Sequence, residues 1–562
     1  MNHSRWQMPP RLPAEHLART KDLPPLMAQL LYSRGITEPA QVEPFLAADE
    51  RLLADPFLLP DMDKAVARIY RALLSAESIT IYGDFDADGI TATALLAQGI
   101  SSLGGRVIPY IPRRIEEGYG LNHAALESLH KQGISLVITV DCGISTVAEV
   151  ERAQQMGLDV VITDHHTVPP QIPPAIAAVD PKRADSRYPF PDLAGVGVAF
   201  KLLQAIHSAL GKEELLDHLL DLVALGTVAD MVTLLGENRY LVKRGLEVLN
   251  RANRLGLRVM ARSAGVPPGS IDPQTISWVL APRLNAAGRL DHAITSYELL
   301  STSSEEEAQR LANLLESKNA ERQRLTDQVL AKARQKLLAL GTDAPLLMVG
   351  DEDFPSGVVG VVAGRLVEEF YRPTIVFEMG EEWSRGSARS IPEFNVIAAL
   401  TQCSDLLSRF GGHPMAAGFT TPTANLPHLQ ERLVEIAASQ LAGLDLRPLI
   451  AIDAELPLSS LQGKAFHMMQ QLAPFGRDNP LPTFLSRGVK VTEYRSVGST
   501  GEHIRLKLRD GDVTWDGVAF KLGNLIGEVT RCLDIVYNLE VDRWRGEELL
   551  QLNILDFAPC QG

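Results

Sequence analysis

The chain has 562 residues, of which 45% are hydrophobic and 22% are charged, a composition typical of a fully folded protein. Its length is too great for one hydrophobic core, so we expect roughly three or four domains. No apolar run approaches the roughly 20 residues that span a bilayer, which argues against a membrane protein. The net charge of −15 excludes a uniformly basic surface, so a nucleic-acid partner would need basic residues concentrated in one channel.

Four apolar runs in the first half of the chain each lead into acidic or imidazole side chains. These polar residues are Asp84, Asp86 and Asp88 after the first run, Asp141 after the second, His165 and His166 after the third, and Asp230 in the fourth. The first three runs are short, β-branched and continuously hydrophobic, which predicts strands of a parallel sheet buried on both faces. Helical patterns follow the first two runs, over residues 90–103 and 146–156.

The carboxyl ends of parallel strands meet at one edge of a sheet, so we expect these side chains to converge. A single Asp after a strand is more often a turn former or helix N-cap, and a His beside it is more often a buried structural residue. Three carboxylates within five residues repel one another, however, unless a cation compensates their charge. The sequence therefore predicts a pair of divalent ions, Mn2+ or Mg2+, at this edge.

Residues 304–340 predict one long helix. Ser304 and Glu307 match a capping box, and Gly341 follows as a C-cap. Such a helix would reach about 55 Å, long enough to connect two domains, and packing within a single bundle is the alternative. Beyond it a second α/β unit is predicted, with strands at 346–350 and 374–378 around a helix at 357–370. From about residue 449 the chain is rich in strands, which we place at 489–494, 503–508, 518–520 and 535–540.

Cys142, Cys403, Cys532 and Cys560 are scattered and lack the spacing of a metal site, which fits a reducing compartment. The first six residues have no signal-peptide hydrophobic region, so we expect a cytoplasmic protein without membrane association.

Taken together, these motifs resemble the DHH phosphoesterase superfamily, and specifically the bacterial RecJ single-strand exonucleases. Besides the four polar clusters, the resemblance rests on Leu193-Ala-Gly-Val-Gly-Val-Ala-Phe200, on the run from Gly226 to Arg239, and on Pro282-Arg-Leu-Asn-Ala-Ala-Gly-Arg289. The second half adds motifs similar to those of a DHHA1 domain and an oligonucleotide-binding (OB) barrel. They are Gly386-Ser-Ala-Arg-Ser390, Phe410-Gly-Gly-His-Pro-Met-Ala-Ala-Gly418 and Pro474-Phe-Gly-Arg-Asp-Asn-Pro480.

The resemblance implies an α/β protein of four parts. An N-terminal segment and a parallel-sheet DHH catalytic domain would occupy residues 1–300, and a long connecting helix residues 301–341. An α/β DHHA1 domain would follow over 342–443, and a C-terminal OB-fold β-barrel over 444–562.

The resemblance also assigns site residues. The implied metal ligands are Asp86, Asp88, Asp141, His165 and Asp230, with Asp84 as an auxiliary ligand. Asp141 would bridge two ions, and His166 would face the scissile phosphate. Much of the superfamily has His where this chain has Tyr82, which leaves one ion a looser shell that depends on Asp84 or water.

Further positions match residues that contact DNA phosphates in the family. They are Arg114, Arg289, Arg365, Ser387, Arg389 and His413. The alternatives are that Arg365 caps its helix, that Arg389 forms a surface ion pair, and that His413 is a buried structural residue.

The implied activity is a metal-dependent, single-stranded-DNA-specific exonuclease that works 5′ to 3′ and releases 5′-mononucleotides in DNA recombination and repair. The expected partners are single-stranded DNA, single-strand-binding protein and a RecQ-type helicase, and a monomer is expected. One alternative is a DHH-family nano-RNase or cyclic-dinucleotide phosphodiesterase, against which the OB-like segment and the chain length argue. Another is a non-catalytic CDC45-like scaffold, against which the retained metal ligands argue.

Overall fold

The structure is a computed structural model that describes residues 3–114, 116–211, 213–251, 253–461, 463–542 and 549–560. The chain divides into two compact units. The first unit comprises Leu12–Asn319 and His467–Leu481, and the second comprises Met1–Arg11, Ala320–Phe466 and Pro482–Gly562. Every helix in the described ranges is too short or too polar to cross a membrane.

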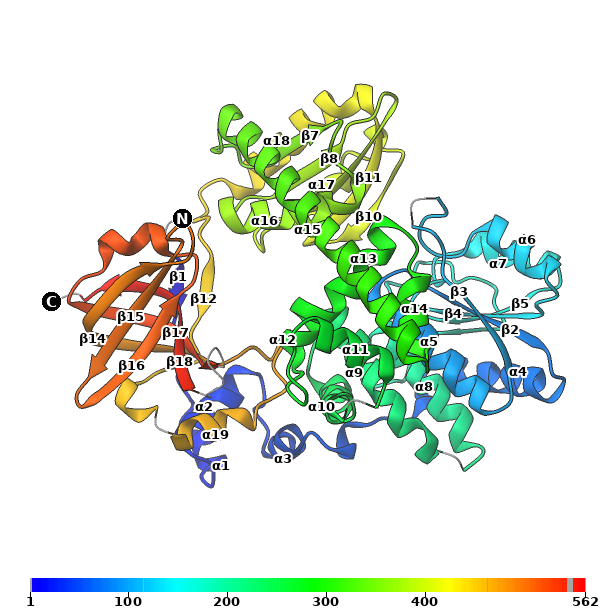
Figure 1. Ribbon diagram of the computed structural model, residues 1–562, viewed down its shortest axis with the longest axis horizontal. Helices are drawn as coiled ribbons and strands as arrows, with labels where there is room; N and C mark the ends of the chain where they lie inside the picture. Colours follow the sequence, from blue (N-terminus) through cyan, green and yellow to red (C-terminus); the bar gives the residue numbers. More distant parts are fainter. Residues whose placement is uncertain are drawn as a thin grey trace. The chain divides into compact units, whose positions relative to one another are not determined.

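The first unit is built on a parallel sheet, drawn in blue and cyan in Figure 1. Its strands, in spatial order, are β3 (Arg106–Tyr110), β2 (Ser78–Gly83), β4 (Leu136–Val140), β5 (Asp159–Thr163) and β6 (Ala177–Val179). β4 is buried along its whole length, and Ile79 and Tyr82 of β2 face separate hydrophobic cores. The predicted parallel sheet with two covered faces is therefore confirmed.

The order of these strands creates a topological switch point. From β2 the chain passes to β3 on one side and then to β4 on the other, so that β2 lies between them. In open α/β sheets, ligands bind beyond the carboxyl ends of the strands where the winding reverses. The first two acidic motifs follow β2 and β4, on either side of this point.

Helices cover the sheet and continue into an all-helical region. Around the sheet lie α4 (Met62–Leu74), α5 (Ala87–Ser102), α6 (His123–Lys131), α7 (Val147–Gln155) and α8 (Gly195–Ser208). Further along are α9 (Leu220–Ala229), α10 (Gly236–Asn250), α11 (Leu255–Ser263), α12 (Pro273–Thr275), α13 (Ala281–Leu290) and α14 (Ile294–Ser301). The N-terminal helices of this unit are α1 (Ala14–Arg19), α2 (Pro25–Ser33) and α3 (Pro39–Ala47).

The predicted long helix is present as α15 (Glu305–Leu340). Ser304 accepts a hydrogen bond at its hydroxyl from the backbone N–H of Glu307, which is one half of the predicted capping box. The reciprocal half is replaced, because the backbone N–H of Ser304 donates to Thr302 and the Glu307 carboxylate pairs with Arg310. The boundary between the two units falls inside this helix, between Asn319 and Ala320. Its 36 residues correspond to about 54 Å of helix.

The second unit contains a mixed sheet. Its strands, in spatial order, are β10 (Arg409–His413), β11 (Ala416–Pro422), β9 (Trp383–Arg389), β8 (Thr374–Glu378) and β7 (Leu347–Asp351). β7 and β8 are parallel, and the remaining neighbours are antiparallel. The covering helices are α16 (Ser356–Phe370), α17 (Val396–Thr401) and α18 (Leu426–Leu441). The predicted strand–helix–strand order over residues 346–378 is confirmed.

A β-barrel forms the rest of the second unit, with its strands in orange and red in Figure 1. They are β13 (Ala454–Glu455), β14 (Thr483–Val497), β15 (His503–Asp510), β16 (Val513–Ala519), β17 (Cys532–Asp542) and β18 (Leu549–Pro559). The sheet runs β14-β15-β16-β18-β17, and pairing of β14 with β17 closes it. β18 was not predicted. Beside the barrel, β1 (Arg5–Gln7) pairs with β12 (Leu449–Ala451), and α19 (Gly463–Gln470) follows β13. The α/β fold class with a C-terminal barrel is confirmed, whereas the four domain boundaries stay a prediction.

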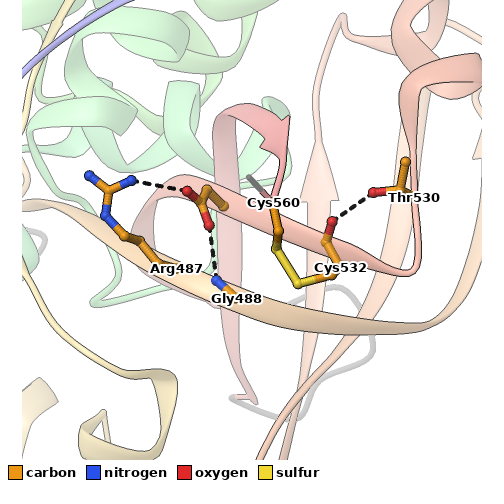
Figure 2. Close-up of a disulfide and its surroundings, with 6 residues drawn as sticks. Arg487, Gly488, Thr530, Cys532 and Cys560 are labelled. Carbon is orange, nitrogen blue, oxygen red and sulfur yellow. Dashed lines mark hydrogen bonds and ion pairs between the residues drawn. A yellow bond between two sulfur atoms is a disulfide. The ribbon is translucent and has the colours of Figure 1, made fainter. Parts of the chain in front are cut away.

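Two of the four cysteines are paired, contrary to the expectation of scattered, reduced thiols. Cys532 at the start of β17 forms a disulfide with Cys560, which directly follows β18 (Figure 2). The two strands are antiparallel neighbours, with Leu533 opposite Pro559, and this register brings the cysteines together although 28 positions separate them in sequence. Because β18 was not predicted, sequence spacing gave no signal for the pair.

Candidate metal centre

All seven predicted metal and catalytic side chains fall into three overlapping groups at the sheet edge. The groups are Asp84, Asp86 and Asp141; Asp141, His165 and His166; and Asp88, His165 and Asp230. Within each group, one potential ligand atom from every residue lies within 4.8 Å of the others. Asp141 and His165 each belong to two groups, so they occupy the middle of the site.

The backbone at Asp141 is in the left-handed region, with φ of 59°. Asp is among the few non-glycine residues that adopt this conformation readily. Its side chain lies against the N-terminus of α8, where Gly195 leaves the space: a Cβ at this position would come within 2.6 Å of the Asp141 Cβ. The motif from Leu193 to Phe200 thus supplies a close backbone approach behind a central carboxylate.

The same helix N-terminus holds Asp88. Its Oδ2 accepts a hydrogen bond of 2.7 Å from the backbone N–H of Gly195, and its Oδ1 accepts one of 2.8 Å from Val196. Exposed amide groups at the start of a helix favour an anion there. Asp88 is therefore fixed by a segment more than a hundred positions away, a relationship that sequence spacing does not reveal.

Asp86 is both a helix N-cap and a potential metal ligand, the two roles considered from the sequence. It is the N-cap of α5, where its side chain accepts hydrogen bonds from the backbone N–H groups of Asp88 and Gly89. It also lies in a group with Asp84 and Asp141. The helix cap consequently aims a second carboxylate into the same site.

Burial and mutual repulsion make these carboxylates costly to ionise. Burial raises the pKa of Asp88 to about 7 and that of Asp230 to about 8, and neighbouring Asp charges add to both shifts. The pKa values of Asp84 and Asp141 are raised by the same two causes. A bound divalent cation removes this cost, because it replaces repulsion between carboxylates with attraction.

The donor atoms fit such ions. Asp141 Oδ1 lies 3.0 Å from His165 Nε2, and both atoms are buried without a hydrogen-bond partner among the described residues. Burial lowers the pKa of His165 to about 3, with the charge of His166 as the second cause, so its imidazole is neutral and can offer a lone pair. Carboxylate oxygens with one imidazole are a ligand set suited to Mn2+ and to the harder Mg2+.

His166 is held by Asp164, a residue that sequence reasoning did not assign. Asp164 Oδ1 accepts a hydrogen bond of 2.7 Å from His166 Nδ1, and its Oδ2 accepts one from the backbone N–H of Ile144. Burial opposes a charge on His166, but the Asp164 hydrogen bond and the charges of Asp164, Asp230 and Asp84 together outweigh it and raise the His166 pKa to about 9. The position of Asp164 directly before the two histidines was the available signal.

Tyr82 does not take part in the site. It is fully buried in the core under α6 and α7, where its hydroxyl donates to the Gly120 carbonyl over 2.9 Å and its ring stacks on Tyr110. Cys142, the residue after Asp141, lies in the same core.

Three aromatic and basic side chains border the metal groups. The Tyr119 hydroxyl lies 3.2 Å from His166 Nδ1 and donates to the Asp141 carbonyl, and the Arg114 guanidinium lies 4.9 Å above the Phe85 ring. Sequence reasoning selected Arg114 and missed Tyr119, which follows it in the same loop.

Arg289 lies in the last turn of α13. That helix contacts the metal loop, the segment from Asp84 to Asp88 that follows β2. Asn285 of the same helix accepts a hydrogen bond of 2.8 Å from the backbone N–H of Ala87, the residue between Asp86 and Asp88. Arg114 and Arg289 therefore both belong to elements that contact the first acidic motif.

Ser387, Arg389 and His413 come together in the second unit. Arg389 Nη1 donates to Ser387 Oγ over 2.8 Å. Arg389 and His413 are both register partners of Ala416, so they lie on the same face of the sheet. His413 is exposed, which excludes the buried structural alternative. Arg365, by contrast, forms an ion pair of 2.7 Å with Asp327 of α15.

Comparison with known proteins agrees with this architecture. Family models match the chain as the DHH family N-terminal domain over residues 78–227, the DHHA1 domain over 343–439 and the RecJ OB domain over 452–556. The single-stranded-DNA-specific exonuclease RecJ of Bacillus subtilis is 39% identical over 99% of this chain and 71% of its own length.

Solved structures of RecJ from Thermus thermophilus share the fold. The Mn2+ complex has a TM-score of 0.85 and 31% identity, covering 99% of this chain and 80% of that one. The Mg2+ complex has a TM-score of 0.80 and 30% identity, covering 99% and 79%. The chain therefore belongs to the RecJ family of single-stranded-DNA-specific exonucleases.

Proposed function

We propose that this protein degrades single-stranded DNA from the 5′ end, hydrolysing one phosphodiester at a time with two divalent ions, Mn2+ or Mg2+, and releasing 5′-mononucleotides. The observation that carries the proposal is the convergence of Asp84, Asp86, Asp88, Asp141, His165 and Asp230 at the switch point of the sheet, in a chain of the RecJ family. We assign these six residues as the metal ligands.

Two ions at such a site lower the pKa of the attacking water and stabilise charge on the attacking and leaving oxygens. The protein supplies the remaining parts. Asp141 belongs to two of the ligand groups and would connect them. His166 keeps its proton through Asp164, so its other nitrogen can donate to a phosphate oxygen or to the leaving oxygen.

The direction of degradation and the preference for single-stranded over double-stranded DNA must come from groups that bind the rest of the strand. We assign Ser387, Arg389 and His413 to the 5′-terminal phosphate, because a hydroxyl, a guanidinium and an imidazole share one sheet face beside backbone rich in glycine. Arg114 and Arg289 are assigned to backbone phosphates near the metal centre. Arg365 is assigned to the 5′-terminal phosphate or to the backbone phosphates next to it, which requires it to leave Asp327.

The proposal extends to the setting of the enzyme. The four-part division at residues 300, 341 and 443 would assign catalysis, connection, end binding and strand binding to successive segments. The family implies work in recombination and repair, in the cytoplasm, as a monomer, with single-strand-binding protein and a RecQ-type helicase as partners.

Digestion of end-labelled oligonucleotides tests the direction. With Mn2+ present, a 5′ label on single-stranded DNA should appear at once as mononucleotide, while a 3′ label should pass through progressively shorter fragments. Double-stranded DNA should remain intact, and EDTA should stop the reaction. Immediate release of the 3′ label would overturn the direction, and equal cleavage of duplex would overturn the strand choice.

A further inference from the structure

Trp278 is the most exposed aromatic side chain among the described residues, with 77% of its surface accessible. An indole buries 150–250 Å2 when it packs, so an exposed one on a well-formed helical segment is a strong candidate for a binding contact. The proposed mechanism gives this residue no role.

The local backbone is unusual. Trp278 is in the middle of a π-helical turn, Ile276–Leu280, between α12 and α13 (Figure 1). Such turns are rare and often occur at functional sites. Ile276 and Leu280 of the turn are fully buried, so the turn is anchored in the core while Trp278 points away from it.

The helical segment that carries Trp278 continues to the first acidic motif. Asn285 follows Trp278 by seven residues, about 10 Å along the helix axis, and Arg289 comes one turn later. Leu280, Leu284 and Ala287 are buried, so the segment is anchored along its length. Asn285 accepts a hydrogen bond from the backbone N–H of Ala87, so α13 contacts the loop that carries Asp86 and Asp88.

A second contact supports this placement. The π-helical turn packs against α9, the helix that ends at Asp230, and Gly288 of α13 lies so close to the metal loop that an added Cβ would be 2.6 Å from the Phe85 carbonyl oxygen. The segment is thus attached to elements that present carboxylates from two separate motifs.

We propose that Trp278 is a stacking platform for one base of the single strand whose scissile phosphate is at the metal centre. The inference rests on the proposed function. An aromatic face accepts any base, so it binds single strands without sequence preference. In a duplex, the bases are paired and stacked on one another and cannot reach it, so the contact also favours single strands.

Binding of full-length protein to single-stranded oligonucleotides tests the proposal. In an Asp141→Ala background that prevents cleavage, Trp278→Ala should weaken affinity about 5- to 150-fold, the range for loss of one base–aromatic stack. Trp278→Phe should retain most of the affinity. The matched control is Phe57→Ala, which removes another exposed aromatic from the same unit away from α13.

An abasic scan separates stacking from a structural role. A series of oligonucleotides, each missing one base, should reveal a position where Trp278 protein loses affinity and the Trp278→Ala variant does not. An identical abasic profile in the two proteins would overturn the proposal, whether or not overall affinity falls. Failure of the Trp278 protein to bind any single strand would instead overturn the proposed function, and the inference with it.

Discussion

Nδ1 of His166 donates a 2.7 Å hydrogen bond to the buried carboxylate of Asp164. The bond fixes which imidazole nitrogen faces the protein and leaves Nε2 for the substrate. Asp164 belongs to none of the potential metal groups among the described residues, and its contact with His166 assigns it to positioning and charging that neighbour. In the proposed function, the motif of one Asp and two His thus divides into a positioning residue, a phosphate-facing residue and a metal ligand.

Asp164→Asn should weaken the hydrogen bond to His166 and lower the His166 pKa. Loss of a charge-assisted hydrogen bond costs about 1.5–3 kcal/mol, which corresponds to roughly 1–2 units in the pKa of His166. We expect the alkaline limb of the pH–rate profile to move to lower pH by that amount while metal affinity changes little. His166→Gln, the control, should remove the limb. An alkaline limb that stays in place in Asp164→Asn would show that the hydrogen bond does not set the His166 pKa.

Gly195→Ala tests the close approach behind Asp141. The added Cβ would lie 2.6 Å from the Asp141 Cβ and 2.8 Å from its Oδ1, so the carboxylate must shift. Overpacking of this kind costs about 1–3 kcal/mol, and we expect Mn2+ affinity to fall roughly 5- to 150-fold. Gly197→Ala on the same helix is the control, since its Cβ would meet Leu193 at an ordinary 3.4 Å. Equal metal affinity in the two variants, by calorimetry, would contradict the account.

The raised carboxylate pKa values predict how pH affects the metal-free protein. Asp88 and Asp230 titrate at about 7 and about 8 in the folded state, above the usual 3.8 of an unfolded Asp. Between these values the folded state binds more protons than the unfolded state, so stability should fall as pH rises from about 4 to about 8. Saturating Mn2+ should reverse the trend. Thermal unfolding at several pH values, with EDTA or with Mn2+, measures the stability of the metal-free and of the metal-bound protein. Metal-free stability that rises from about pH 4 to about pH 8 would be inconsistent with the burial of Asp88 and Asp230.

Arg389→Ala should reduce the preference for a 5′-phosphate. One charge-assisted contact contributes about 1.5–3 kcal/mol, or roughly 10- to 150-fold, and cleavage of 5′-hydroxyl DNA should change much less. Arg432→Ala provides a matched control, because that arginine belongs to the same unit but pairs with Asp405. If the ratio of rates on phosphorylated and hydroxyl substrates is the same in Arg389→Ala and wild type, Arg389 does not bind the terminal phosphate.

Local patterns predicted the elements that carry the site well. The buried runs before Asp84 and Asp141 are strands β2 and β4, and the predicted cap residue Ser304 directly precedes α15. Patterns of this kind are visible because the period of apolar residues and the capping chemistry are properties of adjacent residues.

Relationships between distant segments were not predictable in the same way. The hydrogen bonds from the N-terminus of α8 to Asp88 join two motifs that are far apart in sequence. Tyr82 lies on the face of β2 opposite Ile79 and Ile81, away from the potential metal ligands. β18 begins after the undescribed residues 543–548, and without its register the disulfide from Cys532 to Cys560 had no signal. These features depend on tertiary pairing, which no single window of sequence contains.

The central claim is that one carboxylate shared between two ligand groups organises a two-ion hydrolytic site. The most direct test is turnover of 5′-labelled single-stranded DNA by Asp141→Ala in saturating Mn2+, with circular dichroism to establish that the variant is folded. Because Asp141 belongs to two groups, its removal should disturb both ion positions and leave only a trace of activity. A folded Asp141→Ala protein that keeps more than about a tenth of wild-type turnover, a loss of less than about 1.4 kcal/mol in transition-state stabilisation, would contradict the shared-ligand assignment.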